Sequence, residues 1–465
     1  MTMWTPELSR YGGARYLAIV EAIAEDIERG RLKPGTQMPT HRELASKINV
    51  TIGTVTRAYA EAARRGLLVG ETGRGTFVRE SLFDDAVLGL TPDDDESLID
   101  LSLNIPPLPV GDPLGQALAK TLKGLSGRQG LSALMDYQPA AGAERHRAAG
   151  AALIARSGIN ASAEQVIVCS GALHAMTVVF STLCKPGDTI LTESLTYPGM
   201  KNLAHLLNLR LQGLAVDEQG IVPAAFEEAC RRGPSRMLYT IPTIQNPLGT
   251  VMPEERRREI AAIAQAHDVA IVEDDVHSFM LPHPPPPLSS FAPEQSYYIL
   301  STSKSIAGGM RVGYLLAPER MIEPLSTSLR ATVWMAAPLL AEIAAEWILD
   351  GTADRLVEQK RLEAMARQEI AGRLLSSFEF DAHPLSFHLW LHLPEPWRSN
   401  EFTAQLRRRG VVVTPSEAFV PGRVEAPHAV RVCLGAPRSR AQLESGLAIL
   451  RETLQGTPDP CLSII

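Results

Sequence analysis

Hydrophobic positions in the first eighty residues follow a helical period and then the pattern of two short strands. Apolar residues recur at helical spacing from Tyr16 to Ile27, and Gly30 stands where such a helix would end. Two further helices follow a Lys-Pro-Gly turn, and apolar strands are expected at 67–69 and 76–78. Two helices joined by a tight turn and followed by a β-hairpin are typical of a winged helix-turn-helix.

Polar residues mark the starts of the second and third helices. Thr40 and Glu43 form a capping box, in which each side chain accepts a hydrogen bond from the other residue's backbone amide. Thr51 can cap the third helix, which runs to about Arg65. This helix is expected to turn three side chains inward: Val55, Tyr59 and Ala62.

From about residue 101 to 455, short apolar strands alternate with helical stretches such as 253–267. The strands expected here are Val166–Cys169, Thr189–Thr192, Met237–Ile241, Val269–Glu273, Tyr297–Leu300 and Val312–Leu316. This alternation is typical of an α/β domain with a mostly parallel sheet. The last hundred residues predict a smaller α+β domain with helices at 340–376 and 440–455 and strands at His388–Leu393, Val411–Thr414 and Val430–Leu434.

Charge divides the chain unevenly. Residues 1–80 carry 12 basic and 9 acidic side chains, although the whole chain has a net charge of −7. Residues 81–100 hold seven acids and no base, so we expect a linker whose charge keeps it off DNA. The predicted domains are a winged helix at 1–79, a linker at 80–100, a large α/β domain at 101–335 and a small α+β domain at 336–465.

Composition excludes several classes of protein. With 45% apolar and 21% charged residues, the chain can bury a core and is not basic enough to coat nucleic acid. Its five cysteines are scattered and form no CxxC pair, so neither a disulfide framework nor a metal site is expected. It has no run of 18 apolar residues and no basic-then-apolar start, which predicts a cytoplasmic protein that does not enter membranes.

The third helix carries the residues expected to meet DNA. In a winged helix this element lies in the major groove with its first turn toward the bases, which assigns Thr51, Thr54 and Arg57 to the interface. Arg42 in the second helix is placed to hold the phosphate backbone, and Arg74 at the hairpin tip can enter the minor groove. The alternative is a small helical dimerisation module whose charges are only solvated.

The segment from residue 30 to 78 bears on this choice. It reads GRLKPGTQMPTHRELASKINVTIGTVTRAYAEAARRGLLVGETGRGTFV and resembles, without a gap, the winged-helix domain of the GntR family. The resemblance implies a double-stranded DNA operator as partner. One departure is Ile52-Gly53, where many relatives carry polar or basic residues, so specificity is expected from Thr51, Thr54, the wing or DNA shape.

Lys304, in Ser301-Thr302-Ser303-Lys304, follows a predicted strand. A Ser-x-x-Lys motif also occurs in serine acyl-enzymes, but no Lys-Thr-Gly is present, and we discount that chemistry. A lysine can instead form a Schiff base with pyridoxal phosphate (PLP). The phosphate, ring nitrogen, ring face and ring oxygen of this cofactor each need a protein partner.

Candidates for the phosphate come from two segments, one after the predicted strand Val166–Cys169 and one after the predicted strand Tyr297–Leu300. The backbone amides of Ala172 and Leu173 open a helix directly after a strand, where a phosphate binds well. The hydroxyl groups of Ser301 and Ser303 and the guanidinium of Arg311 complete this set.

Candidates for the cofactor ring lie between these two phosphate segments in the sequence. Tyr197 can stack on the ring, Asn246 can donate to the ring oxygen, and Asp274 can hold the proton of the ring nitrogen. Each residue alone has an ordinary structural explanation, such as a buried aromatic, a turn or a helix cap. Their joint order and spacing nevertheless indicate a PLP site.

Residues 100–455 resemble the fold-type I aminotransferases. The motifs that carry the resemblance are DYQP with a following glycine, QNPLGTVMPEERR, IVEDD and TSKSIAGGMRVGYLLAP. The resemblance implies that Tyr137 reaches the phosphate in the neighbouring subunit of a homodimer. It also implies that Arg431 binds the α-carboxylate of an amino acid.

One position departs from the aminotransferase pattern. Relatives usually place a tyrosine two or three residues after the ring-facing aspartate, and this chain has Val276 and His277 there. His277 is either a substitute donor to the ring oxygen or a structural histidine, and the sequence leaves both open. Because this chain lacks the phenol of that tyrosine, we expect transamination to be less efficient than in the aminotransferases.

The two resemblances together are typical of the MocR (GabR-like) subfamily of transcription regulators. They imply a head-to-tail homodimer that binds an operator and senses an amino acid or amine through an internal aldimine on Lys304. PLP itself is the other candidate effector. The alternative function is a working aminotransferase with an appended winged helix.

Overall fold

The computed structural model describes residues 4–11, 14–33, 35–65, 67–71, 75–78, 98–107, 109, 111–233, 235–422 and 425–458. Backbone contacts divide the chain into two compact units, one within residues 1–87 and one within residues 88–457. Arg74 and residues 80–97 of the expected linker lie outside the described residues. The finer domain boundaries expected from the sequence stay predictions.

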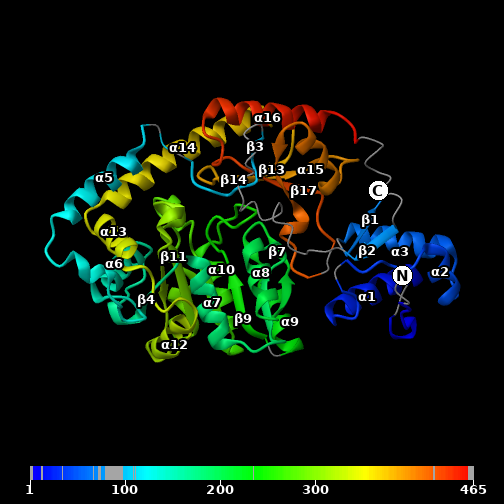
Figure 1. Cartoon of the computed structure of the whole chain (residues 1–465), viewed down its shortest axis with the longest axis horizontal. Coiled ribbons are helices and arrows are strands. Elements are labelled where there is room, and N and C mark those ends of the chain that lie inside the picture. The colour runs from blue at the N-terminus through cyan, green and yellow to red at the C-terminus, as the bar shows by residue number, and fades with distance from the viewer. Residues whose placement is uncertain are drawn as a thin grey trace. The chain divides into compact units, whose positions relative to one another are not determined.

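The N-terminal unit is a winged helix, as predicted. Its elements are α1 (Arg15–Glu28), α2 (His41–Lys47), α3 (Ile52–Arg64) and an antiparallel hairpin of β1 (Leu68–Glu71) and β2 (Gly75–Val78) (Figure 1). Val55, Tyr59 and Ala62 of α3 are buried against Ile23 of α1, which confirms the expected inward face. Gly30, just after α1, has a φ of 69°, a left-handed conformation that suits glycine at the end of a helix.

The predicted caps fix where α2 and α3 begin. Thr40 Oγ1 accepts from the Glu43 amide at 3.3 Å, and Glu43 Oε2 accepts from the Thr40 amide at 2.9 Å. Thr51 Oγ1 accepts from the Thr54 amide at 3.1 Å. These bonds satisfy amides that a helix start leaves without intrahelical partners.

The larger unit is built on a seven-stranded sheet in the order β4-β12-β11-β10-β9-β5-β6. Its strands are β4 (Val166–Cys169), β5 (Thr189–Glu193), β6 (Arg210–Leu214), β9 (Ser235–Thr240), β10 (Ala270–Asp274), β11 (Ser296–Ser301) and β12 (Gly313–Leu316). β12 runs antiparallel to both of its neighbours, and the other described pairs of this sheet are parallel. The expected mostly parallel sheet is confirmed, and each of the six expected strands ends within two residues of its prediction.

The register of the sheet brings distant sequence positions to one edge. Ser301 at the end of β11 pairs with Gly313, which pairs in turn with Cys169 at the end of β4. Asp274 ends the neighbouring strand β10 and pairs with Ile299. Because these strand ends share one edge, the loops that follow them can form a common site.

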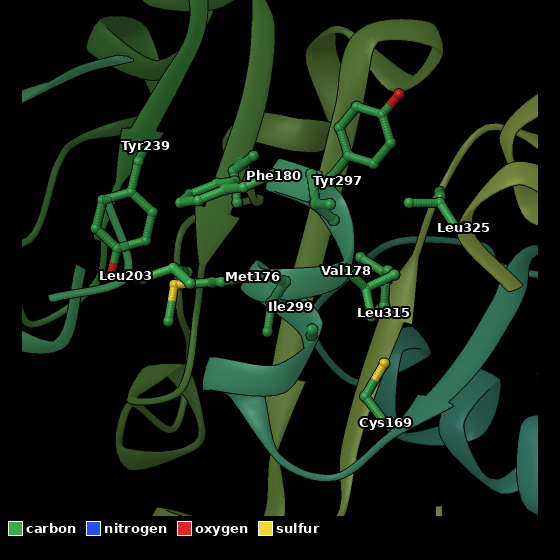
Figure 2. Close-up of a cluster of buried hydrophobic side chains, with 14 of the residues drawn as sticks. Cys169, Met176, Val178, Phe180, Leu203, Tyr239, Tyr297, Ile299, Leu315 and Leu325 are labelled. Atoms are coloured by element: carbon green, nitrogen blue, oxygen red, sulfur yellow. The ribbon is translucent and has the colours of Figure 1, made fainter. Parts of the chain in front are cut away.

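A hydrophobic core packs α7 (Ala172–Leu183) on the sheet. Figure 2 shows Met176 and Phe180 of α7 beside Tyr239 and Ile299, which come from β9 and β11. The Phe180 and Tyr239 rings meet edge to face with centroids 6.5 Å apart. The core therefore fixes the start of α7 relative to the strand ends.

The other helices and small strands of this unit have the following bounds. The helices are α5 (Pro113–Ser126), α6 (Glu144–Ala155), α8 (Pro198–Leu206), α9 (Pro223–Arg232), α10 (Glu254–Ala266) and α12 (Ile322–Val333). Small strands pair β3 (Ile99–Asp100) with β15 (Val411–Val412) and β7 (Val216–Asp217) with β8 (Gly220–Ile221). None of the described helices combines the length and apolar character needed to span a bilayer.

A second sheet with the order β13-β14-β17-β16 forms the expected smaller α+β region. Its elements are β13 (Phe380–Asp381), β14 (His388–His392), β16 (Thr414–Pro415), β17 (Ala429–Cys433), α15 (Ser399–Arg408) and α16 (Arg440–Gln455). A cluster around Leu389, Trp397 and Leu447 forms its core.

The stretch expected to be helical at 340–376 holds two helices, α13 (Pro338–Leu349) and α14 (Thr352–Leu374). The helix breaks at Gly351, which has a left-handed φ of 78°. Trp347 of α13 is buried with residues of β4 and β11 such as Val166 and Tyr298, so α13 packs on the main sheet. α14 extends from beside α13 to beside α16 (Figure 1).

Candidate functional site

Lys304 lies on α11 (Thr302–Ser305), a single turn that follows β11 directly. Its Nζ donates to the backbone carbonyl of Asn104, which comes from the segment before α5. Burial lowers the pKa of Lys304 to about 8, and the positive charges of Arg431 and Arg311 act in the same direction. Lys304 is therefore a lysine with an unusually large neutral fraction near neutral pH.

Asp274 stands at the end of β10 and is 3% exposed. Its Oδ2 accepts from the Tyr239 hydroxyl at 2.8 Å, and its Oδ1 has no partner among the described residues. Burial raises the pKa of Asp274 to about 6, although the Tyr239 hydrogen bond and the charge of Lys304 oppose the shift. One carboxylate oxygen is thus free to accept from a ligand.

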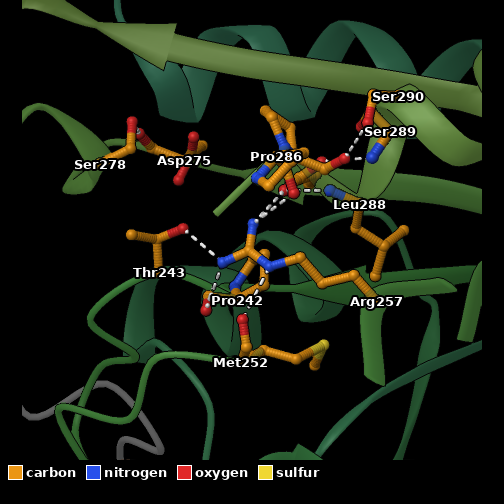
Figure 3. A network of polar contacts seen from close by, with 12 residues as sticks. Pro242, Thr243, Met252, Arg257, Asp275, Ser278, Pro286, Leu288, Ser289 and Ser290 are labelled. Atoms are coloured by element: carbon orange, nitrogen blue, oxygen red, sulfur yellow. Dashed lines mark hydrogen bonds and ion pairs between the residues drawn. The ribbon is translucent and has the colours of Figure 1, made fainter. Parts of the chain in front are cut away.

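A second network of buried polar groups holds the residues on either side of Asp274. Figure 3 shows Arg257, which donates to the Thr243 hydroxyl at 3.0 Å and to the Met252 carbonyl at 2.8 Å. Its guanidinium lies 3.6 Å from Glu273 Oε1, and both side chains are fully buried. Asp275 accepts from the Tyr298 hydroxyl at 2.5 Å. These bonds fix the end of β10, and with it the direction of Asp274.

A cradle for an anion lies where β4 leads into α7. Gly171 precedes α7 with a φ of 91°, and a Cβ there would come within 2.7 Å of Arg311 Nη2. Arg311 donates to Ser303 Oγ and to the Ser170 carbonyl, both at 3.2 Å. Because Gly171 carries no side chain, the guanidinium can approach the start of α7 closely.

The other residues expected at the phosphate are in the same neighbourhood. No side chain caps the start of α7 among the described residues, so the amides of Ala172 and Leu173 remain available to a ligand. Ser301 Oγ lies 3.1 Å from Ser303 Oγ, which connects it to Arg311. The structure therefore brings together the residues predicted to hold a phosphate.

Arg431 lies on β17 of the second sheet and contacts Asn246, which lies in the loop after β9 of the main sheet. Its Nη1 donates to Asn246 Oδ1 at 2.9 Å and its Nη2 to the Ser102 carbonyl at 2.7 Å, whereas its Nε has no partner among the described residues. Tyr197 is close enough for its pKa to be raised, first by burial and then by Asp274, with Arg431 opposing. These three predicted residues therefore lie in the same neighbourhood as Asp274.

His277 is buried, its ring interacts with the backbone of Ile244, and neither ring nitrogen makes a hydrogen bond of normal geometry among the described residues. Its ring lies 6.3 Å from that of His388 and 6.5 Å from that of Phe387. Burial lowers the pKa of His277 to about 3, and the charges of Lys304 and Arg431 add to the effect. His277 is therefore neutral, with one ring N–H available as a donor.

Tyr137 lies on the surface of this chain. Its side chain is 81% exposed, and its ring contacts Trp334 with centroids 5.6 Å apart. The single chain does not test the expectation that Tyr137 reaches the partner subunit.

The predicted DNA-contacting residues of α3 line a pocket in the N-terminal unit. Thr51, Thr54 and Arg57 face Arg15 and Tyr16 of α1 across a space of about 330 Å³. The Arg57 guanidinium carbon lies 4.0 Å from the centroid of the Tyr16 ring, a cation–π contact. Arg15 Nη1 donates to the Asn49 carbonyl at 3.2 Å.

Two other features of this surface bear on the sequence predictions. Arg42 is exposed on α2. Ile52, at the start of α3, is 49% exposed. The sequence did not place Tyr16 beside these residues, because its helical spacing alone suggested a core position.

Two family models match the chain. "Bacterial regulatory proteins, gntR family" matches residues 15–78, and "Aminotransferase class I and II" matches residues 96–450. YdeF, an HTH-type transcriptional regulator of Bacillus subtilis, is 31% identical over 451 residues, which cover 97% of this chain and 96% of YdeF. The chain belongs to the MocR subfamily of transcription regulators.

This MocR-type regulator is also similar to proteins with more specific names. The pyridoxine biosynthesis regulator PdxR of Corynebacterium glutamicum is 28% identical over 74% of this chain and 75% of PdxR. TauR of Rhodobacter capsulatus is 27% identical over 86% of this chain and 88% of TauR. The larger domain belongs to a PLP-dependent family of aminotransferase fold.

Solved structures agree on the fold of the larger domain. An archaeal alanine:glyoxylate aminotransferase superposes with a TM-score of 0.71 at 23% identity, covering 77% of this chain and 91% of that one. A kynurenine aminotransferase of Pyrococcus horikoshii gives a TM-score of 0.71 at 20% identity over 78% and 91%. At this level of identity the likeness shows the fold alone.

Sequence reasoning missed several residues that contact the site in this MocR-type regulator. Asn104 and Ser102 supply carbonyl oxygens to Lys304 and Arg431 from a segment with no motif. Lys360 reaches the turn that carries Lys304 from the middle of a long helix. A backbone carbonyl has no sequence signature, and a lysine inside a polar helix is indistinguishable from a surface lysine.

Proposed function

We propose that this regulator binds PLP through Lys304 and uses the bound cofactor to sense an amino compound, which changes its affinity for operator DNA. The supporting observation is a group of buried polar atoms without described partners near Lys304: Asp274 Oδ1, Asn104 Oδ1, Arg431 Nε and both ring nitrogens of His277. An unpaired buried polar group costs about 1–3 kcal/mol. Such a group of atoms is therefore expected to complete its hydrogen bonds with a ligand.

The residues fit the phosphate end of PLP. Arg311 and the hydroxyls of Ser301 and Ser303 offer one cation and two donors, next to the free amides of Ala172 and Leu173. Charge-assisted bonds of this kind are among the strongest that a protein makes to phosphate. These residues would set the position of the cofactor before Lys304 attaches.

The residues also fit the ring. Asp274 would accept from the protonated ring nitrogen, Tyr197 would cover one face, and Asn246 and His277 would donate to the ring oxygen. When bound, PLP supplies an electron-withdrawing ring that makes its carbonyl carbon reactive toward amines. Since His277 is neutral, it can donate but adds no charge to the ring.

Lys304 supplies the amine that attaches to the cofactor. A buried amine with a pKa of about 8 is neutral more often than an exposed lysine, and only the neutral amine has a lone pair to donate. If an amine took the place of Lys304, the freed side-chain amine would need a hydrogen-bond acceptor nearby. The carbonyl of Asn104 already accepts from this amine and can hold it there.

The charge of Arg431 supports an effector with a carboxylate, such as an amino acid. Arg431 is 5% exposed, and the structure gives it no carboxylate partner among the described residues. A buried guanidinium is strongly stabilised by a bidentate carboxylate. PLP itself is the second candidate effector, because the name of the relative PdxR refers to pyridoxine biosynthesis. Either effector acts only through different affinities for two arrangements of the molecule.

We propose that the pocket of α3 holds a phosphate of the DNA backbone. Arg15 and Arg57 provide two cations, and Thr51 and Thr54 provide hydroxyls around the same space. The cation–π contact holds Arg57 against α1, where a backbone contact is easier to form than a contact to a base edge. Arg42 would extend the same interface, and Arg74 is expected to add a contact from the wing.

We also propose a head-to-tail homodimer in the cytoplasm, where operator DNA is found. Met135 and Trp334 are 79% and 54% exposed beside Tyr137, and Leu122 and Leu131 line an apolar pocket with Met135. Exposed apolar clusters of this kind usually form part of a protein–protein interface. Tyr137 within that interface would be able to reach the phosphate in the partner subunit.

The test is spectroscopic and uses the full chain. Purified protein loaded with PLP is expected to show the visible absorbance of a lysine-bound cofactor, and Lys304→Ala is expected to lose it. Candidate amines are then added, with and without a 2-oxo acid, and affinity for an operator selected from a random duplex library is measured in parallel. A band that persists in Lys304→Ala would overturn the assignment of Lys304.

The outcomes of the amine titration separate the functions. A lasting spectral change with a matching change in operator affinity supports an amine sensor. A response of operator affinity to PLP alone identifies the cofactor as effector. Repeated turnover of an amine with the 2-oxo acid, without any effect on DNA affinity, would contradict the sensor.

A further inference from the structure

Lys360 lies in the middle of α14 and is 5% exposed. Its ammonium donates to three successive backbone carbonyls, those of Lys304 at 3.3 Å, Ser305 at 3.0 Å and Ile306. These carbonyls end α11, the single turn that carries Lys304. One side chain from a distant helix thus holds the backbone on which the reactive lysine stands.

The Lys360 ammonium and the carbonyls at the end of α11 complement each other. The last carbonyls of a helical turn lack intrahelical partners, and a cation placed there is favoured. An ammonium has three donors, and here each finds one of the three carbonyls. Burial is costly for a charge, and it lowers the pKa of Lys360 to about 7, with the charge of Lys304 acting in the same direction.

Other side chains of α14 hold backbone segments beside further residues of the pocket. Arg361 donates to the Phe279 carbonyl at 3.1 Å, two residues after His277. Arg367 donates to the Leu434 carbonyl at 2.7 Å, just after the strand that carries Arg431. Lys360 is the member of this series that acts on the turn of Lys304.

We propose that Lys360 is a positioning residue for Lys304, which fixes the turn of α11 so that the Lys304 amine meets the cofactor in the correct place. The inference rests on the proposed function, because it assumes that Lys304 attaches the cofactor. Lys360 does not itself contact the reacting atoms. A protonated Lys360 also disfavours a second positive charge on Lys304, so the two amines share one charge more readily than they hold two.

The experiment measures how fast cofactor-free protein captures PLP, followed by absorbance at a series of pH values. Lys360→Met removes all three donors while keeping a similar shape, Lys360→Gln keeps one donor group, and Lys360→Arg keeps both donors and charge. Arg373→Gln is the matched control, because Arg373 lies on the same helix in an exposed ion pair with Glu444. Thermal unfolding is recorded for every variant.

We expect capture by Lys360→Met to be slower by about tenfold or more, since a displacement of about 1 Å can cost that much. The loss should be larger below pH 7, where Lys360 is mostly charged, because the cation that disfavours a positive charge on Lys304 is then missing from the variant. Lys360→Gln should be intermediate, and Lys360→Arg should restore both rate and pH profile. Arg373→Gln should match the wild type.

A folded Lys360→Met with the wild-type rate and pH profile would overturn the inference. A loss of thermal stability with both kinetic readouts unchanged would also overturn it, because the role would then be only structural. Should the Met variant not fold, the order of Lys360→Gln and Lys360→Arg against the wild type decides. Failure of the proposed function is distinct, since then even the wild type captures no PLP through Lys304.

Discussion

Asp274 ends strand β10 and His277 follows it by three residues, and burial shifts the pKa of each in the direction that removes its charge. Burial raises the pKa of Asp274 to about 6 and lowers that of His277 to about 3. Each keeps polar atoms without a described partner. Buried polar groups without partners lower the stability of the protein when no ligand is bound. They are therefore expected where a ligand supplies the missing hydrogen bonds.

The two interpretations of His277 predict different results for His277→Phe. Phenylalanine keeps the shape and removes two buried nitrogens that make no hydrogen bond of normal geometry, so the free energy of unfolding should stay within about 1 kcal/mol of the wild type or rise. If His277 donates to the ring oxygen, the visible spectrum of the bound cofactor and its pH titration should change. An unaltered spectrum in a stable variant would favour the structural interpretation.

Capture of PLP should depend on pH through two residues with opposite shifts. Lys304 must be neutral, and its pKa of about 8 means that the neutral fraction falls about tenfold per pH unit below that value. Asp274 must be charged to hold the ring proton, and with a pKa of about 6 it loses that charge below pH 6. The capture rate should therefore rise from pH 6 to above pH 8. Stopped-flow absorbance tests this, and a flat profile would contradict the shifted pKa of Lys304.

At the scale of elements, the start of α3 and the start of α1 form one surface. The pocket between them joins Arg15 and Tyr16 to Thr51, Thr54 and Arg57. The spacing of Tyr16 along α1 predicted a core residue, and its ring does pack on the core cluster. Only the packing of α1 against α3 gave the same ring a second role beside Arg57.

Arg57→Ala should weaken operator binding and reduce the slope of log affinity against log salt by about 1, since one phosphate contact is lost. Tyr16→Leu should have a smaller effect in the same direction, because Arg57 loses the ring that holds it. Both substitutions should weaken binding to random duplexes as much as binding to the operator. Arg29→Gln, in an exposed ion pair at the other end of α1, is the control. A loss of sequence preference in Arg57→Ala would instead indicate a base contact.

The capping box of α2 allows a test of the element itself. Thr40→Ala removes the acceptor for the Glu43 amide and should destabilise the winged helix by about 1 kcal/mol. Thermal unfolding should show the loss in the transition of the N-terminal unit, with PLP absorbance unchanged. A variant with unaltered stability would show that the cap contributes nothing measurable.

At the scale of the whole molecule, the site is expected to be complete only in a dimer. Lys304→Ala lacks the attachment point and Tyr137→Phe lacks the hydroxyl offered to the partner subunit, so each alone should bind PLP weakly or not covalently. A mixed dimer has one site in which both residues are intact. Unfolding and refolding the two variants together should restore tight, coloured PLP binding in up to about a quarter of all sites, from statistical pairing of subunits. No recovery in verified mixed dimers would contradict the shared site.

Much of the fold followed from local patterns. The caps at Thr40 and Thr51, the six strands of the main sheet and the glycine after α1 depend on neighbouring residues, which a sequence contains directly. The break at Gly351 was not foreseen, because a glycine inside a helical stretch is often tolerated. The residues proposed for the cofactor site could be selected because strand ends carry them in order, and the edge of a parallel sheet collects such ends.

The sequence by itself determined the winged helix and the mostly parallel sheet, and it led to the prediction that Lys304 attaches the cofactor, because periodicity, caps and motifs are properties of short segments. Only the tertiary structure decided what surrounds these residues. Asn104 and Lys360 are 200 and 56 positions from Lys304, and they bind it or its turn through backbone carbonyls. Likewise the pKa of Lys304 depends on burial, which no single segment provides. Contacts of this kind arise when separate segments pack together, and their energies depend on geometry that residue order alone does not express.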